Sequence, residues 1–393
     1  MDTQLIKKRI EQIAISMANT PNSMPTGLLQ EDGGKLLFYA YYNQYKQDSF
    51  ANDEFQRQLE LYLEKISSGI YFPSYCNGLS GMLFMLDFLL KDEIINIDIS
   101  QAKKYCDSFL LKVLEEQMKN GECDFLHTAT GILYYFANNS STYIDIIDHS
   151  IEYLKQNAIK MECGIAWRDK FEKNSLINFS ISISHGMAGL VIVLTALEYN
   201  RKTTHKLYPL IQGAIDFILS QKYTNDIGSC YPTYCLEADQ GNKSRLGWCN
   251  GDLGIGLALW YAGKIYRNKL WTQEALKIFN IDMYRKNEKE TLVKDAGFCH
   301  GTSGIAQIYR RMYFETGNPL YYETSMHWIN ETLKMGNEDD EKQIGYKTYF
   351  QGKYYPCDNS LLSGLSGIGM VLLSFLCDEK KSSWDKLFLL SIN

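Results

Sequence analysis

The chain has 393 residues, of which 45% are hydrophobic and 22% charged, and its formal net charge is −6 at pH 7. These proportions are typical of a globular protein with a sizeable core, and the length allows one large domain or two to three ordinary ones. Because no block of lysine or arginine offsets the acidic balance, neither nucleic acid nor an anionic membrane is expected as a partner.

The N-terminal segment, MDTQLIKKRIEQIAISMANT, has the pattern of an amphipathic helix and not that of a signal peptide. The ten cysteines are scattered, without the close spacing of a disulfide scaffold. We therefore expect a reducing, cytoplasmic setting, in which cysteines are buried hydrophobes, metal ligands or nucleophiles. The longest uncharged stretches, near 175–197 and 359–377, contain Gly, Ser, Asn or His and suit buried helices better than a membrane span.

A Gly-x-x-Gly turn that opens an apolar run recurs along the chain. A weak copy, EDGGKLLFYAYY (31–42), precedes NGLSGMLFML (77–86), HTATGILYYF (127–136), SHGMAGLVIVL (184–194), CNGDLGIGLALW (249–260), CHGTSGIAQIY (299–309) and LSGLSGIGMVLL (362–373). The first glycine of each clear copy, or its substitute, is Gly78, Thr128, Gly186, Gly251, Gly301 or Gly364. In the weak copy we match Gly34 with Gly81, which makes seven repeats.

Segments with one polar face lie between the copies, at 101–117, 206–222 and 319–335 for example. Each repeat thus supplies an outer amphipathic helix and an inner helix that is apolar on all sides and must be buried. Such pairs cannot bury their own faces, but they can stack and close into a ring. The sequence predicts an all-α fold, an α/α toroid of seven inner and seven outer helices, as a single domain over 1–393.

Three side chains with metal-ligand chemistry precede the repeat glycines. Cys249, Cys299 and His300 each lie one or two residues before the first glycine, so equivalent inner helices would bring them together at one end of the ring. Two thiolates and one imidazole suit Zn²⁺, and three protein ligands leave a position open for a substrate. The alternative is that these are ordinary buried cysteines, as we expect for Cys76.

The motifs GWCNG, CHG and SHGMAG, together with the Gly-x-x-Gly repeats, resemble the lanthionine synthetase C-like family over essentially the whole chain. The resemblance implies an α/α toroid, Zn²⁺ held by Cys249, Cys299 and His300, and the activity of a lanthipeptide cyclase. Such a cyclase adds cysteine thiols of a precursor peptide to dehydroalanine or dehydrobutyrine, which forms thioether rings. The repeat spacing leaves no room for a sizeable insertion, so we expect the SH2-like accessory domain that some members carry to be missing or vestigial.

The same resemblance points to three catalytic residues. His185 would exchange the protons of the thiol and the enolate, although a histidine before an apolar helix can also be a capping or core residue. Asp124 would orient His185 or relay protons, and the alternative is an N-terminal capping carboxylate. Arg245 would stabilise the enolate or anchor Asp124, and the alternative is a surface salt bridge.

Some positions depart from the family pattern. Asn250 follows the first zinc cysteine where members often carry Tyr or His, and it cannot donate a proton in the same way. Thr128 replaces the first glycine of its repeat, which affects how the Asp124 side chain is positioned. His127 lies next to Thr128 in the sequence, and only this proximity favours a role for it. The loop 336–358 is acidic and then rich in Tyr and Phe, and we expect it either to grip the peptide or to be a solvated loop with packing aromatics.

The resemblance implies several partners: a dehydrated precursor peptide with leader and core, a class I dehydratase, and a peptide exporter. The expected location is the cytoplasm, at the periphery of a membrane-associated biosynthetic complex. Two other functions stay open, namely addition of glutathione to dehydrated residues in proteins, and a non-catalytic toroid that acts as a scaffold or binding module.

Overall fold

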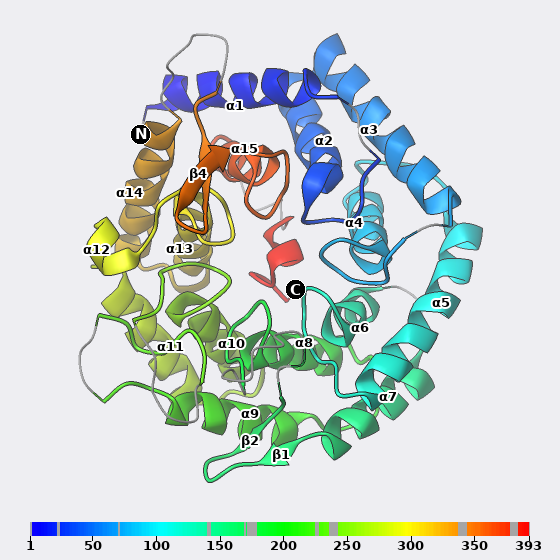
Figure 1. Cartoon of the computed structure of the whole chain (residues 1–393), viewed down its shortest axis with the longest axis vertical. Helices are drawn as coiled ribbons and strands as arrows, with labels where there is room; N and C mark the ends of the chain where they lie inside the picture. Colours follow the sequence, from blue (N-terminus) through cyan, green and yellow to red (C-terminus); the bar gives the residue numbers. More distant parts are fainter. Residues whose placement is uncertain are drawn as a thin grey trace. The chain divides into compact units, whose positions relative to one another are not determined.

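Helices dominate the protein, as the sequence predicts. The computed structural model describes residues 2–21, 24–69, 71–139, 143–168, 170, 179–224, 228–235, 243–336, 344–377 and 384–392. Within these ranges the strands form only two short antiparallel pairs, and the remaining elements in Figure 1 are helices. No disulfide joins the ten cysteines, all of which lie in the described ranges.

The chain divides into two compact units. The first comprises Met1–Phe72, Asn77–Ile97 and Val293–Ser391, and the second comprises Pro73–Cys76, Asp98–Leu292 and Ile392–Asn393. The single domain over 1–393 therefore stays a prediction.

Seven apolar helices begin where the repeats predict them. In the first unit they are α2 (Lys35–Lys46), α4 (Leu79–Lys91), α13 (Thr302–Thr316) and α15 (Leu365–Ser374), and in the second α6 (Ala129–Asn138), α8 (Met187–Tyr199) and α10 (Asp252–Ile265). Six of them follow directly on the predicted glycine or on Thr128, which is the N-cap residue. In α8 every residue from Met187 to Leu197 is buried, which confirms a helix apolar on all sides.

Seven amphipathic helices accompany them in the described residues. They are α1 (Thr3–Ala18), α3 (Ser49–Ser67) and α14 (Pro319–Met335) in the first unit, and α5 (Ser100–Lys119), α7 (Ile144–Gln156), α9 (Tyr208–Ser220) and α11 (Lys269–Asp282) in the second. Within the units α2 packs on α3, α13 on α14, α8 on α9 and α10 on α11 (Figure 1). In α11 the side chain of Asn268 caps the first turn, and Trp271, Ala275, Ile278 and Phe279 form one buried stripe.

Backbone hydrogen bonds link equivalent positions of successive repeats, two residues before each helix cap. In the second unit the N–H of Cys76 donates to Leu126 C=O (2.8 Å), that of Leu126 to Ser184 C=O (3.3 Å) and that of Ser184 to Cys249 C=O (3.4 Å). These positions therefore form one ladder, which holds the turns before α6, α8 and α10 in a common register.

The first unit contains the same ladder. The N–H of Cys299 donates to Leu362 C=O (2.7 Å), and that of Leu362 donates to Leu29 C=O (2.8 Å). Since Leu29 lies five residues before Gly34, as Cys76 lies five before Gly81, the ladder supports the match of the weak N-terminal copy. The second glycine of a repeat is needed because the helix backbone there lies against the backbone of the preceding turn. A Cβ on Gly304 would lie 1.8 Å from the carbonyl oxygen of Phe298.

The two strand pairs are β1 (Ile159–Lys160) with β2 (Ile165–Ala166), and β3 (Lys347–Phe350) with β4 (Lys353–Pro356). The prediction of a loop over 336–358 is therefore wrong for 347–356, where Thr348 pairs with Tyr355 and Tyr349 with Tyr354. Residues 337–343 lie outside the described ranges. The described residues also form three short helical elements, η1 (Glu31–Gly34), α12 (Glu288–Thr291) and η3 (Trp384–Phe388). No helix in the described ranges is at once long and apolar enough to span a bilayer.

Candidate metal and proton-transfer site

The turn that carries Cys249 is bonded directly to the turn that carries His185. Ser184 donates to Cys249 C=O through its N–H and also through its hydroxyl, at 3.0 Å. The His185 N–H in turn donates to the Ser182 hydroxyl (3.0 Å). Because Ser184 directly precedes His185, these bonds fix the predicted proton donor relative to the predicted metal ligand in the second unit.

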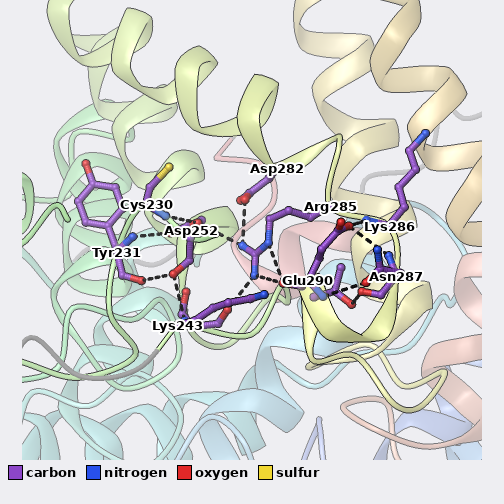
Figure 2. Close-up of polar contacts among 12 residues, drawn as sticks. Cys230, Tyr231, Lys243, Asp252, Asp282, Arg285, Lys286, Asn287 and Glu290 are labelled. Carbon is purple, nitrogen blue, oxygen red and sulfur yellow. Dashed lines mark hydrogen bonds and ion pairs between the residues drawn. The ribbon is translucent and has the colours of Figure 1, made fainter. Parts of the chain in front are cut away.

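A buried ion network anchors the segment that leads into Cys249 (Figure 2). The guanidinium of Arg285 contacts Asp252 Oδ2 (3.3 Å) and Asp282 Oδ1 (3.0 Å), and it donates to Ser244 C=O (2.8 Å) and to Glu290 C=O (2.9 Å). Asp252 also accepts the N–H groups of Cys230 and Tyr231. Since Asp252 opens α10 and Ser244 lies five residues before Cys249, the network holds both ends of the Cys249 turn.

Burial determines the charge state of this network. Asp252 and Asp282 are fully buried, and burial raises the pKa of both carboxyls. The pKa of Asp282 rises further because the carboxyl of Asp252 lies beside it. Asp282 is therefore the carboxyl whose pKa rises more, and the guanidinium of Arg285 lies within ion-pair distance of both carboxyls and lowers the pKa of each.

Gly251 shows why the turn between Cys249 and α10 needs a glycine. Its φ of +87° lies in the left-handed region, and a Cβ there would come within 2.7 Å of the Ser244 hydroxyl and 2.8 Å of Arg245 C=O. The Arg245 side chain is half-buried. No ion pair joins Asp124 and Arg245 in the described residues, so an anchoring role toward Asp124 finds no support.

Asp124 and His185 lie together, as a dyad within the second unit. Asp124 is buried, its Oδ2 contacts Nδ1 of His185, and its Oδ1 accepts the N–H of His127 (2.6 Å). Thr128 supports this arrangement, because its hydroxyl accepts the Asp124 N–H (2.8 Å) and donates to Glu122 C=O (3.0 Å). The threonine that replaces glycine thus holds the Asp124 turn, while the carboxylate holds the His185 ring.

The imidazole of His127 stacks on that of His185, with ring centroids 5.7 Å apart and an interplanar angle of 14°. Burial lowers the pKa of His127, and the neighbouring His185 lowers it further, whereas Asp124 acts in the opposite direction. A neutral His127 therefore lies against the ring of His185. Sequence reasoning found no role for His127, since proximity in the chain does not reveal stacking.

Cys299 and His300 lie in the first unit, in the turn before α13. Nε2 of His300 lies 3.3 Å from Oδ2 of Asp295, a buried carboxylate that also accepts the N–H groups of Gly297 and Tyr349. Burial alone would raise the pKa of Asp295, but His300 and the two N–H donors outweigh this effect and lower it. A carboxylate this close to one ring nitrogen can orient the imidazole.

Asp295 was missed in the sequence. Its C=O accepts the N–H of Thr302, the first residue of α13, and in the last repeat Asp358 C=O accepts from Leu365 in the same way. Both aspartates lie six residues before the cap glycine. This shared offset is the signal that a closer comparison of the repeats would have revealed.

The donor chemistry of Cys249, Cys299 and His300 fits a metal. Two thiols and an imidazole are a donor set that Zn²⁺ prefers. Cys76 occupies the equivalent position two residues before its cap, but burial raises the pKa of its thiol, and its neighbour is Asn77. Cys76 therefore has the character of a structural cysteine.

Comparison with known proteins places this arrangement in context. The family model of the lanthionine synthetase C-like protein matches residues 20–389. The nisin biosynthesis protein NisC of Lactococcus lactis subsp. lactis is 23% identical over 371 residues, which cover 86% of this chain and 83% of that protein. The solved structure of nisin cyclase matches with a TM-score of 0.75 at 17% identity, over 98% of this chain and 97% of the other. The shared fold confirms the predicted fold class.

Proposed function

Since the chain belongs to the lanthionine synthetase C-like family, we propose that it is a zinc-dependent peptide cyclase that forms thioether rings. Its substrate would be a dehydrated precursor peptide, whose cysteine thiols add to dehydroalanine or dehydrobutyrine. The observation that carries the proposal is the bonding of the Cys249 turn to the turn of His185, whose ring is held by Asp124. The turn with one potential thiolate ligand, Cys249, is thus bonded to the turn with one potential proton-transfer group, His185.

We propose that Cys249, Cys299 and His300 together hold Zn²⁺. When bound, the ion would lower the pKa of a thiol in its open position, so that the nucleophilic thiolate forms near neutral pH. Asp295 supports this assignment, because its Oδ2 lies 3.3 Å from Nε2 of His300 and can orient that ring. Asn250 lies beside Cys249 without a titratable group, so proton transfer falls to His185.

His185 is proposed to move the proton. With Nδ1 bonded to Asp124, the imidazole uses Nε2 to take the proton of the thiol. The sulfur then bonds to Cβ of the dehydrated residue, the π electrons move toward the carbonyl as an enolate, and His185 returns a proton to Cα. Arg245, four residues before Cys249, carries a positive charge that would stabilise the enolate.

The proposed partners follow from this chemistry. Dehydroalanine and dehydrobutyrine arise from serine and threonine by loss of water, so a dehydratase must act on the precursor peptide first. We infer that the cyclase works beside such a dehydratase and a peptide exporter, in a complex at the cytoplasmic face of the membrane.

A metal analysis combined with peptide mass spectrometry tests the function. We expect about one zinc per chain, and incubation with a dehydrated peptide should remove free thiols without a change in mass. Cys299→Ala and His300→Ala should lose both zinc and ring formation, whereas Cys76→Ala, at the equivalent repeat position, should keep both. Ring formation at the wild-type rate by a zinc-free variant would contradict the proposal. Preferential addition of glutathione to the same peptide would instead favour the glutathione-adding function.

A further inference from the structure

A cavity of about 450 Å³ lies in the second unit, beside the dyad. Asp124 and His185 both line it. Its apolar lining is supplied by Trp167, Met187 and Leu190, all of which are buried. The volume falls within the range of about 300–1,000 Å³ that is usual for ligand pockets. The cavity is therefore large enough for a peptide segment.

The charged lining of the cavity carries both signs, from the buried Asp124 and the half-buried Glu122 and from two exposed cations. The cations are Arg168 and Lys170, which follow β2. Both are long and carry several N–H donors, which suit the carbonyl oxygens of an extended peptide, and one of those of Lys170 donates to Asn120 C=O. The cavity thus combines an apolar wall with cationic donors, two carboxyls and a proton-transfer group.

His185 connects this cavity with the turn of the predicted metal ligand. His185 lines the cavity, and Ser184, the residue before it, bonds to Cys249 C=O. Neither the Cys249 turn nor α10 contributes a lining residue to the cavity in the part of the chain that the structure describes. A nucleophile held at Cys249 and an acceptor in the cavity would therefore meet at His185.

We propose that this cavity binds the segment of the precursor peptide that carries the dehydrated residue. The inference rests on the proposed function and assigns the acceptor half of the substrate to a place distinct from the thiol. The C–S bond forms at Cβ, the π electron pair moves onto the carbonyl oxygen, and the proton that His185 took from the thiol is delivered to Cα. No atom is lost and no oxidant is needed.

A binding experiment with a peptide that cannot cyclise tests the proposal. The probe is a dehydroalanine peptide in which every cysteine is replaced by alanine, and titration calorimetry measures its Kd. Arg168→Ala/Lys170→Ala should bind the probe about 10-fold or more weakly, because two donors of the cavity are lost. The matched control is Lys160→Ala/Arg201→Ala, which removes the same two charges from exposed positions outside the cavity and should bind like wild type.

Two further variants sharpen the result. Leu190→Phe narrows the cavity and should weaken binding of a dehydrobutyrine probe, which has one more methyl group, more than that of the dehydroalanine probe. A urea titration of this variant shows whether it is folded. Cys299→Ala should retain wild-type affinity, because the acceptor does not contact the metal ligands. The proposal is overturned if the Arg168/Lys170 variant binds as tightly as wild type, or if Cys299→Ala abolishes binding.

The failure of this inference differs from failure of the proposed function. Wild-type enzyme with a complete, cysteine-containing dehydrated peptide tests the function alone. If rings form while the Arg168/Lys170 and Leu190 variants bind and cyclise normally, only the assignment of the cavity is wrong. If wild type forms no rings, the cyclase function is wrong whatever the binding data show.

Discussion

Arg285→Met tests how strongly the buried network holds the Cys249 turn. Arg285 is 5% exposed and Asp252 is 0% exposed, so the substitution leaves a carboxylate in the interior without its counter-charge. It also removes the donors to Ser244 C=O and Glu290 C=O. Breaking one partner of a buried pair typically costs about 3–5 kcal/mol, and we expect a loss in this range because the remaining partners of Asp252, two N–H groups and the Asp282 carboxyl, carry no positive charge.

Urea titration followed by circular dichroism measures the free energy of unfolding for this comparison. The second variant is Arg285→Met/Asp252→Asn, which removes the charge as well as its partner. Because the two sites interact directly, the double variant should be more stable than the sum of the single losses predicts, by about 0.5–3 kcal/mol. The interpretation is refuted if Arg285→Met costs less than about 1 kcal/mol, or if the two losses are additive.

Three other predictions concern the dyad and the repeat glycines. Asp124→Asn should lower the rate of ring formation by about 10²-fold or more at unchanged zinc content, and an equal loss of zinc would argue for a structural role. The pKa of His127 is lowered in the folded state, so protons bind the unfolded chain first and wild type should lose stability as the pH falls below about 6.5. His127→Asn should lose less stability than wild type between about pH 7.5 and about pH 5.5, as measured by urea midpoints. An equal loss in the two proteins would contradict the assignment. Gly304→Ala should be destabilising by about 3 kcal/mol or more, since its Cβ meets a carbonyl oxygen at 1.8 Å. Gly317→Ala, in open space at φ +71°, should cost only about 1 kcal/mol in the same urea assay, and the reverse order would contradict the packing argument.

The comparison of sequence and structure shows which features are encoded locally. The N-caps of α6, α8, α10, α13 and α15 are the repeat positions that the sequence indicated, because a cap followed by an all-apolar run is readable within a dozen positions. The offsets of Cys249, Cys299 and His300 from their cap glycines were equally readable. Repetition made these local signals strong, since each repeat confirmed the pattern of the others.

Other features depended on residues far apart in the chain. Asp124 and His185 are 61 positions apart, and Arg285 lies 41 positions beyond the carbonyl of Ser244 that it holds. The bond between Tyr349 and Asp295 spans 54 positions and ties the unpredicted hairpin to the orienting carboxylate. No periodicity within a helix reveals these pairs.

The sequence by itself determined where helices begin, which faces are apolar and which donors stand beside the caps, because these properties follow from the side chains of one short segment. Only the tertiary structure decided which carboxylate holds which histidine, which arginine neutralises which aspartate, and where a cavity lies. Those outcomes depend on the register in which separate helices pack, and many distant residues set that register together.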